Sequence, residues 1–263
     1  MSAPALGRPV ALVTGAGGGL GGAIARALAI KGFDLVLNDL RESVALAHLR
    51  EAIAHEGVGA NIVIQDLGAV DELEAFVERV HAVHGRLDCL VNNAGVSVLS
   101  RGDILDVTPE SFYRCLAINL RAQFFLTQKV ARRMIREPRT EEGRRRAIIT
   151  ISTVAVEHIV GRVLAEYSIS KAGLSHMVKH FAARLATEGI DCYEVRPGMM
   201  KSDMTASSRD KYDGLIAAGF VPAHRWGELA EVGRVVANLA DGALSYAVGQ
   251  TLNIDGGMYL KTF

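Results

Sequence analysis

A tyrosine and a lysine four residues apart, Tyr167 and Lys171, open a long helical pattern in the 263-residue chain. This spacing places both side chains on one face of a helix. A phenol with a pKa of about 10 is a poor base at neutral pH, but a nearby ammonium group stabilises its phenolate. Such a tyrosine can take or return the proton of an alcohol while a hydride moves at the neighbouring carbon. A surface pair with the same spacing also arises by chance, so the interpretation depends on the rest of the chain.

A glycine-rich loop follows the first apolar run of the chain. Residues 14–22 read Thr-Gly-Ala-Gly-Gly-Gly-Leu-Gly-Gly and lead into a helical pattern. Glycine allows the backbone to approach a ligand closely, and a helix N-terminus presents unpaired N–H groups and a positive dipole end. Because the loop joins a strand to a helix in the first βαβ unit, it predicts a binding site for the pyrophosphate of a dinucleotide. The cofactor-binding residues predicted here are Gly15, Gly17, Gly19, Leu20 and Gly21.

An acidic residue, Asp39, ends the next apolar run, 18 residues after Gly21. A carboxylate at this place can accept hydrogen bonds from both hydroxyls of an adenosine ribose, and it would repel a 2′-phosphate. Arg41 is either a partner for such a phosphate or a solvated side chain at the start of the next helix. We expect NAD rather than NADP, with Leu40 beside Asp39 among the cofactor contacts.

Short apolar runs alternate with long helical patterns along the whole chain. Continuous apolar runs are typical of strands buried on both faces of a parallel sheet. Strand–helix repetition gives a doubly wound sheet with helices on both faces, and no linker interrupts it. We therefore expect one α/β domain of the Rossmann type over residues 1–263. The expected strands are 10–13, 34–37, 61–64, 88–91, 147–151, 191–195 and 250–254, and the expected helices lie near 20–31, 42–55, 71–83, 109–135, 165–187 and 228–239.

Two segments interrupt this alternation. Residues 136–146 form a charged loop in which three glutamates offset much of the basic charge. We expect a solvated loop there, with a docking patch for an acidic partner as the alternative. Residues 198–225 lack a strong period, and a long irregular segment late in an α/β enzyme is often a lid over the substrate. We expect a lid, with an ordinary surface excursion containing a short helix as the alternative.

Composition and charge exclude several classes of protein. Lys and Arg together number 29, as do Asp and Glu, so the net charge is zero and a broad nucleic-acid footprint is not expected. Three cysteines are too few for a disulfide framework, and no stretch approaches the length of a membrane span. The first strand, at Val10, leaves no room for a signal peptide. We expect a cytoplasmic protein without nucleic-acid or membrane partners.

The chain resembles the short-chain dehydrogenase/reductase family over essentially its whole length. It is similar both to 3-oxoacyl-acyl-carrier-protein reductase-like members and to polyol or sugar dehydrogenases. The resemblance implies an oxidoreductase that interconverts a secondary alcohol and its ketone by hydride transfer with a nicotinamide cofactor. The motifs that carry it are Thr14-Gly15-x-x-x-Gly19-x-Gly21, Asn92-Asn93-Ala94-Gly95, Asn119, Tyr167-Ser-Ile-Ser-Lys171, Arg196-Pro197-Gly198 and Asp255-Gly256-Gly257.

The resemblance also implies roles for single residues. Tyr167 is expected to be the general acid/base, and Lys171 to lower its pKa and hold the nicotinamide ribose. Asn119 is expected to support a water in a proton relay. Ser202 stands where the family usually has a threonine that holds the carboxamide with the Met200 backbone. The remaining implied contacts are Asn93, Ala94 and Gly95 on the adenosine side, Asp66 and Leu67 at the adenine, and Pro197 and Gly198 after the sixth strand.

The chain departs from the family at the serine that holds the substrate oxygen. The family commonly places it 13 residues before the tyrosine, where this chain has Val154. Matching the end of the fifth strand favours Thr153, with one extra residue before Tyr167, and Ser152 is the alternative if the pleat is shifted by one. Either hydroxyl can donate to a carbonyl or alkoxide oxygen. Because side chains alternate along a strand, we expect only one of them to face the site.

Several functional alternatives stay open. One is a reductase of 3-oxoacyl thioesters on acyl carrier protein or coenzyme A; such family members usually prefer NADPH, so Asp39 counts against it. A non-catalytic nucleotide sensor or scaffold would have no physical need for the Tyr–Lys pair. The resemblance further implies a homodimer or homotetramer that pairs through the helices at 109–135 and 165–187.

Other polar residues have weaker interpretations. His176 and His180 have the spacing of a metal pair but no convincing third ligand, so we expect packing or an interface role and no metal. The polar stretch between the fifth strand and Tyr167 borders the substrate in the family. It suits a polyol or sugar, and surface exposure explains it equally well. Its members are Glu157, His158, Arg162 and Glu166.

Overall fold

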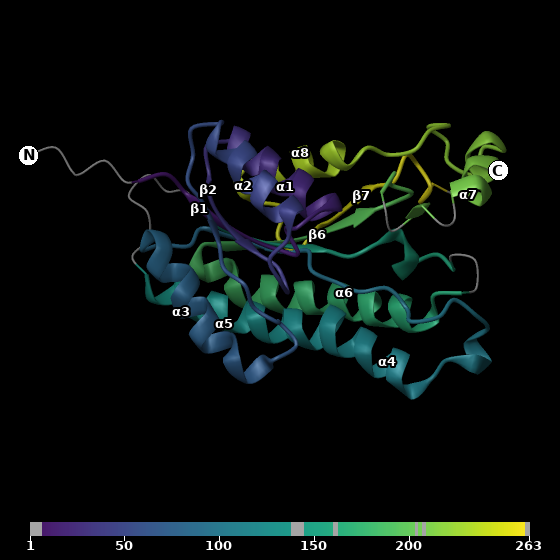
Figure 1. Ribbon diagram of the computed structural model, residues 1–263, viewed down its shortest axis with the longest axis horizontal. Helices are drawn as coiled ribbons and strands as arrows, with labels where there is room; N and C mark the ends of the chain where they lie inside the picture. Colours follow the sequence, from purple (N-terminus) through teal and green to yellow (C-terminus); the bar gives the residue numbers. More distant parts are fainter. Residues whose placement is uncertain (1–6, 138–144, 160–162, 203–204, 207–208, 261–263) are drawn as a thin grey trace, which may run out of the picture.

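The computed structural model describes residues 7–137, 145–159, 163–202, 205–206 and 209–260. In this part of the chain, a parallel seven-stranded sheet lies between two layers of helices (Figure 1). The spatial order is β3-β2-β1-β4-β5-β6-β7, so the predicted doubly wound α/β fold and its strands are confirmed. The strands are β1 (Val10–Thr14), β2 (Asp34–Asn38), β3 (Ala60–Ile62), β4 (Cys89–Asn92), β5 (Arg146–Ile151), β6 (Ile190–Pro197) and β7 (Thr251–Ile254).

Helices cover both faces of this sheet. In Figure 1, α1, α2 and α8 lie above it, and α3, α4, α5 and α6 lie below it. The helices are α1 (Gly19–Ile30), α2 (Val44–Ala54), α3 (Leu73–His84), α4 (Pro109–Cys115), α5 (Gln123–Arg136), α6 (Ala165–Leu185), α7 (Arg209–Ala217) and α8 (Leu229–Ala240). Shorter helical segments are η1 (Val70–Glu72), η2 (Ile104–Asp106), η3 (Leu116–Ala122), η4 (Val154–Val156) and η5 (Ala186–Glu188).

Each helical layer closes over its own apolar core. Along β1, Ala11 and Val13 belong to the core under α1, α2 and α8, whereas Val10 and Leu12 belong to the core under α3, α5 and α6. All four side chains are at most 1% exposed. A strand buried on both faces needs apolar residues at successive positions, which is why the apolar runs are continuous.

The structure differs from the predicted helices in two places. The predicted helix at 109–135 is α4 and α5 joined by η3, which is π-helical. The apolar pattern of the sequence predicts one helix here and does not distinguish a short π-helical turn within it. The predicted lid at 198–225 contains α7, whose polar sequence has little periodicity. Residues 203–204 and 207–208 of that segment, and 138–144 of the predicted charged loop, lie outside the described residues.

The centre of the sheet brings the functional segments together. From the neighbouring strands β1 and β4, the chain continues to β2 and β3 on one side and to β5, β6 and β7 on the other. Open α/β sheets bind ligands at such a switch point, beyond the carboxyl ends of the strands. The glycine loop follows β1, the segment after Asn92 follows β4, and Thr153 follows β5.

Candidate active site

A cavity of about 570 Å³ opens at the carboxyl edge of the sheet. It extends from the glycine loop and Asp39 at one end to Tyr167, Val154 and Met258 at the other. Most of the predicted site residues line it. They are Gly15, Gly19, Leu20, Gly21, Asp39, Asn93, Ala94, Gly95, Ser152, Thr153, Tyr167, Lys171, Pro197, Gly198, Met200 and Ser202.

The other predicted residues lie outside the lining of this cavity. The Gly17 amide donates a hydrogen bond to Asp39, and Leu40 is 60% exposed. Asp66 accepts a hydrogen bond from the Gly68 amide at 2.8 Å, and Leu67 is buried. Their predicted contacts with the cofactor stay predictions.

Several lining residues were not predicted. Gly18 lies inside the glycine motif, where spacing alone does not distinguish it from its neighbours. Ser97, Arg101 and Tyr212 enter from the segments after β4 and before α8, and no local motif marks them. Tyr212 lies in the segment 198–225 that the sequence predicts as a lid, whereas Ser97 and Arg101 carry no sequence signal of their own.

Side-chain hydrogen bonds join the carboxyl ends of the neighbouring strands β1 and β4. Thr14 Oγ1 donates to the Val91 carbonyl and accepts from the amides of Asn93 and Ala94, each at 3.0 Å. Asn93 Nδ2 donates to the carbonyls of Thr14 at 2.9 Å and Gly15 at 3.1 Å. The two carboxyl ends are thereby held together directly below the glycine loop.

The glycine loop needs glycine for close approach. A Cβ on Gly21 would lie 2.0 Å from the Gly15 carbonyl oxygen, so no side chain fits there. Gly19 has φ +51°, and a Cβ on Gly18 or Gly19 would meet no protein atom within 4 Å, because both face open space. Helix α1 starts here without a side-chain cap and without an acidic residue in its first turn. Its N-terminal N–H groups are therefore suited to a phosphate group.

Asp39 is fixed at the far end of the cavity. Its Oδ2 accepts the Gly17 amide and its Oδ1 accepts the Leu40 amide, both at 2.7 Å. Each carboxylate oxygen has two lone pairs, so acceptor capacity remains for a ligand. The Asp39 carboxylate is thus hydrogen-bonded directly to the glycine loop.

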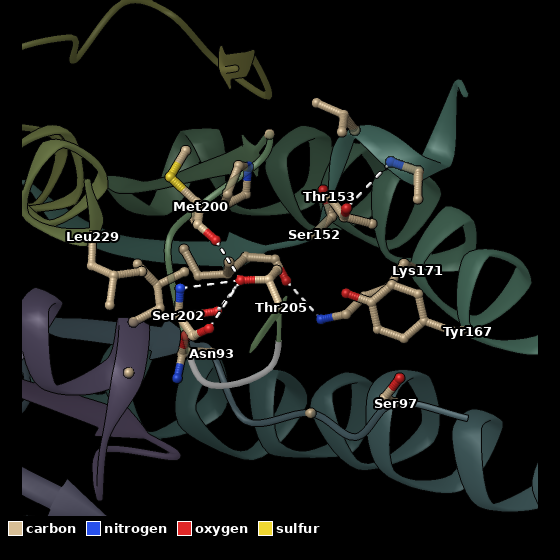
Figure 2. A pocket seen from close by; sticks show the side chains of 18 of the residues that line it. Asn93, Ser97, Ser152, Thr153, Tyr167, Lys171, Met200, Ser202, Thr205 and Leu229 are labelled. Carbon is tan, nitrogen blue, oxygen red and sulfur yellow. Dashed lines mark hydrogen bonds between the residues drawn. The ribbon is translucent and has the colours of Figure 1, made fainter. Parts of the chain in front are cut away.

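Tyr167 and Lys171 lie one turn apart near the start of α6. In Figure 2, their polar ends point to the same side, toward the centre of the cavity. Burial raises the pKa of Tyr167 to about 12, while a hydrogen bond with Thr153 opposes the rise. Tyr167 therefore holds its proton at neutral pH.

Lys171 is 4% exposed, and its Nζ donates to the Ile151 carbonyl at 2.9 Å. Burial lowers the pKa of Lys171 to about 8, and the charge of Glu194 opposes the fall. At neutral pH the ammonium form therefore predominates. The contribution that opposes the rise in the pKa of Tyr167 comes from Thr153, so the predicted lowering of that pKa by Lys171 stays a prediction.

The hydroxyls of Ser152 and Thr153 point in different directions. The Ser152 hydroxyl donates to the buried Glu194 carboxylate, away from Tyr167. Thr153 Oγ1 accepts the Ala155 amide at 3.2 Å, and the interaction of Thr153 with Tyr167 opposes the rise in the pKa of Tyr167. This geometry supports the predicted alternation, with the Thr153 hydroxyl on the Tyr167 side.

Both polar atoms of the Asn119 side chain form hydrogen bonds within the protein. Its Oδ1 accepts the Val96 amide at 2.7 Å, and its Nδ2 donates to the Val96 carbonyl and to Ser170 Oγ, both at 3.0 Å. Asn119 is fully buried in η3 and joins it to the segment after β4 and to α6. Its predicted role in a proton relay stays a prediction.

The segment after β6 contributes to the lining of the same cavity. Thr205 Oγ1 donates to the Met200 carbonyl at 2.9 Å and accepts the Ser202 amide at 3.1 Å (Figure 2). The Ser202 hydroxyl lies 3.4 Å from Thr205 Oγ1. The two hydroxyls hold the turn that presents Met200 and Ser202 to the cavity.

The described members of the polar stretch before Tyr167 lie outside the cavity lining. Glu166 is 2% exposed and accepts a hydrogen bond from Ser111, and Glu157 accepts one from Arg196 at 3.0 Å. Apolar side chains line the substrate end instead, among them Val154, Leu164 and Met258. Arg162 lies outside the described residues.

The described residues contain neither a metal site nor a membrane span. There, no three histidine, cysteine or acidic side chains come together as a metal site, and His176 and His180 lie with their rings 5.7 Å apart. No helix of the described chain has the length and apolar character that would let it span a membrane.

Comparison with known proteins gives consistent matches along the chain. Residues 15–259 match the family model described as enoyl-(acyl carrier protein) reductase. The chain is 35% identical over 253 residues to the 3-oxoacyl-(acyl-carrier-protein) reductase FabG of Escherichia coli (strain K12), covering 95% of this chain and 97% of that protein. The corresponding protein of Staphylococcus aureus (strain Mu50) is 32% identical over 251 residues, covering 95% and 98%.

Solved structures agree with this result. The 3-oxoacyl-(acyl-carrier protein) reductase from Brucella melitensis in complex with NAD superimposes with a TM-score of 0.93 at 41% identity, covering 98% of this chain and 100% of that chain. A short-chain type dehydrogenase/reductase from Mycobacterium marinum gives a TM-score of 0.87 at 29% identity, covering 97% of each chain.

Proposed function

Because the chain belongs to the short-chain dehydrogenase/reductase family and is an oxidoreductase of CH–OH groups, we propose that it reduces 3-oxoacyl thioesters with NADH. The reverse reaction oxidises the secondary alcohol. The observation that carries the proposal is the Tyr167–Lys171 pair facing Thr153 in a cavity with an apolar substrate end. We propose a 3-oxoacyl thioester rather than another ketone or secondary alcohol as the substrate, since the curated relatives named above are 3-oxoacyl reductases.

The residues of the cavity fit a nicotinamide dinucleotide. The uncapped start of α1, with open space at Gly18 and Gly19, suits the pyrophosphate. The Asp39 carboxylate, 2.7 Å from the Gly17 amide, suits the ribose hydroxyls of adenosine. Lys171 and the turn at Met200 and Ser202 would hold the nicotinamide half. When bound, the nicotinamide ring supplies or accepts the hydride.

The preference for NAD rests on charge. A 2′-phosphate about 4 Å from Asp39 would be repelled by several kcal/mol at an effective dielectric constant near 20. The Brucella reductase that superimposes so closely contains NAD. Arg41 is exposed at the start of the next segment and does not line the cavity.

The chain's own residues perform the proton chemistry. Thr153 and Tyr167 donate hydrogen bonds to the carbonyl oxygen of the substrate and hold it at the reacting position. As charge develops on that oxygen, Tyr167 gives up its proton, and the Lys171 ammonium stabilises the phenolate that forms. A pKa of about 12 keeps Tyr167 protonated at neutral pH, which suits the reductive direction.

The lining of the cavity supports an acyl substrate. Val154, Leu164 and Met258 present apolar surface beside Tyr167, and the polar groups of Glu157 and Glu166 are engaged elsewhere. A polyol would leave hydroxyls unpaired against these three apolar side chains, and the polar groups that also line the cavity include those of Ser97, Arg101 and Tyr212. An acyl chain instead gains by leaving water.

Replacement of Tyr167 by phenylalanine tests the mechanism. With acetoacetyl-coenzyme A and NADH, Y167F is expected to lose at least about 100-fold in kcat, since it removes the general acid. NADH affinity, measured by fluorescence titration, is expected to stay within about twofold of the wild type. Substantial turnover by Y167F would refute the role of Tyr167.

Cofactor preference is tested by initial rates with NADH and NADPH. The wild type is expected to favour NADH, and Asp39→Ser to improve kcat/KM for NADPH by at least about tenfold, because it removes the repelling charge. Asp71→Ser, at an exposed acid outside the cavity lining for which no cofactor contact is predicted, is the control. A wild-type preference for NADPH would overturn the proposed cofactor and leave the Tyr167 chemistry untouched.

A further inference from the structure

A buried cluster of charged and hydroxyl groups lies one helical turn beyond Lys171. Its centre is Glu194 of β6, whose side chain is 1% exposed. Both carboxylate oxygens are fully used. Oε1 accepts from Ser175 Oγ at 2.7 Å, from Arg196 Nε at 2.8 Å and from the Ser152 hydroxyl, and Oε2 accepts from Thr251 Oγ1 at 2.9 Å and Arg196 Nη2 at 3.1 Å.

These hydrogen bonds reach the elements that carry the catalytic groups. Ser152 is the residue before Thr153 at the end of β5. Ser175 follows Lys171 by four residues and so lies on the same face of α6. Lys171 in turn donates to the carbonyl of Ile151, at the end of β5. Glu194 is therefore the common acceptor that joins the end of β5 to the catalytic face of α6.

The charge of Glu194 is maintained in the interior. Burial raises the pKa of Glu194, but the hydrogen bonds from Arg196, Ser152 and Ser175 outweigh burial and hold it below the ordinary value. The carboxylate is therefore ionised at working pH. A buried ion pair is a weak source of stability, since apolar groups of similar volume often replace it without loss. Stability alone therefore does not explain why the Glu194 carboxylate lies beside the face of α6 that carries Lys171.

We infer that Glu194 is a positioning residue for the reaction. Its carboxylate holds the end of β5 and the face of α6 in the one arrangement that presents Thr153 and Lys171 to the same cavity. The inference rests on the proposed Tyr167 chemistry. The charge of Glu194 also opposes the burial that lowers the pKa of Lys171. The other titratable or charged groups around α6 at this level are Tyr167, Arg196, Glu157, Glu166 and Cys115.

The experiment measures Lys171 directly. The apoprotein is labelled briefly with acetic anhydride over a range of pH, and acetylation of Lys171 is quantified by mass spectrometry. An amine reacts only when neutral, so the midpoint reports its pKa. In Glu194→Gln the midpoint is expected to move about one pH unit lower than in the wild type, because a neighbouring opposite charge is lost. Glu194→Asp, which keeps the charge, is expected to restore most of the shift.

A matched control lies on the same strand. Asp191 is 3% exposed at the other end of β6 and is paired with Arg145 at 2.8 Å. Asp191→Asn removes a buried charge of the same kind and is expected to lower the thermal midpoint without moving the Lys171 midpoint. If E194Q does not fold, the double variant E194Q/R196M, which leaves no unpaired charge, takes its place with the same expectation.

Turnover provides the second readout. In E194Q the kcat for acetoacetyl-coenzyme A is expected to fall about tenfold or more and NADH affinity to stay within about twofold. An unchanged Lys171 midpoint in the folded variant, or an equal shift in D191N, would overturn the inference. Because labelling needs no substrate, it gives a result even if the thioester proves to be the wrong substrate, and the proposed function then fails separately.

Discussion

At the residue scale, the hydroxyl groups of Ser152 and Thr153 are chemically similar but point in different directions. Ser152 and Thr153 are adjacent at the end of β5, where the pleat sends successive side chains to opposite sides. The Ser152 hydroxyl donates to Glu194, whereas Thr153 interacts with Tyr167 and opposes the rise in the pKa of that phenol. We propose that Thr153 holds the substrate oxygen and that Ser152 belongs to the positioning cluster.

Separate replacements of the two hydroxyls test this division. In Thr153→Val, kcat is expected to fall about 100-fold or more, because a hydrogen-bond donor to the developing oxyanion is removed. In Ser152→Ala, the free energy of unfolding is expected to fall by about 1.5–3 kcal/mol, the value of a hydrogen bond to a charged group, with a smaller loss of kcat. Steady-state kinetics and urea unfolding give both quantities. Retained turnover in T153V with its loss in S152A would reverse the assignment.

The sequence predicts this pair of residues but not the choice between them. The family spacing falls on Val154, because one extra residue lies between β5 and Tyr167. The side of the sheet that each hydroxyl faces depends on where the strand ends and on a partner from β6. Glu194 has no motif around it, so its cluster becomes visible only when β5, β6 and α6 are assembled.

At the element scale, local pattern determines where strands and helices occur. The seven apolar runs and six amphipathic patterns reappear as strands and helices, because burial on one or both faces imposes the residue pattern. The π-helical η3, which holds Asn119, leaves that pattern intact and is therefore invisible to it. Helix α7 is short and polar, and it brings Tyr212 to the cavity through contacts with distant residues.

The turn from β1 into α1 gives a prediction at this scale. A Cβ on Gly21 would lie 2.0 Å from the Gly15 carbonyl oxygen, so Gly21→Ala must displace the loop from the start of the helix. NADH affinity is expected to fall at least about tenfold, with about 1–3 kcal/mol lost from the free energy of unfolding. Fluorescence titration and urea unfolding measure the two effects.

The next residue provides the control for that change. A Cβ on Gly22 would have the Ala16 carbonyl oxygen as its nearest neighbour, at 3.6 Å, an ordinary contact. Alanine favours the helix over glycine by about 1 kcal/mol, so Gly22→Ala is expected to keep NADH affinity and to raise stability slightly. Equal losses of affinity in G21A and G22A would contradict the steric argument.

At the scale of the whole molecule, the outer face of α5 and α6 carries apolar groups that the described part of the chain leaves exposed. Phe124 is 38% exposed and packs against Phe181 with ring centroids 5.4 Å apart, and Ile169 is 50% exposed. The same two helices are those through which the family resemblance implies subunit pairing. We therefore propose that this face joins two copies of the chain. A twofold axis would place each residue near its own copy.

A charge placed on this face tests the assembly. Phe124→Asp would bring two carboxylates into the interface by symmetry, so each would have to be desolvated beside a like charge. Sedimentation velocity is expected to show a dimer or tetramer for the wild type and a smaller species for F124D. Val44→Asp, on the opposite layer at a 72% exposed position in the first turn of α2, is expected to leave the assembly intact. Because Tyr167 lies on α6, two residues before Ile169, dissociation is also expected to loosen the start of that helix and raise the KM for the acyl substrate. A wild-type monomer, or an F124D protein of unchanged size, would show that this face serves another purpose.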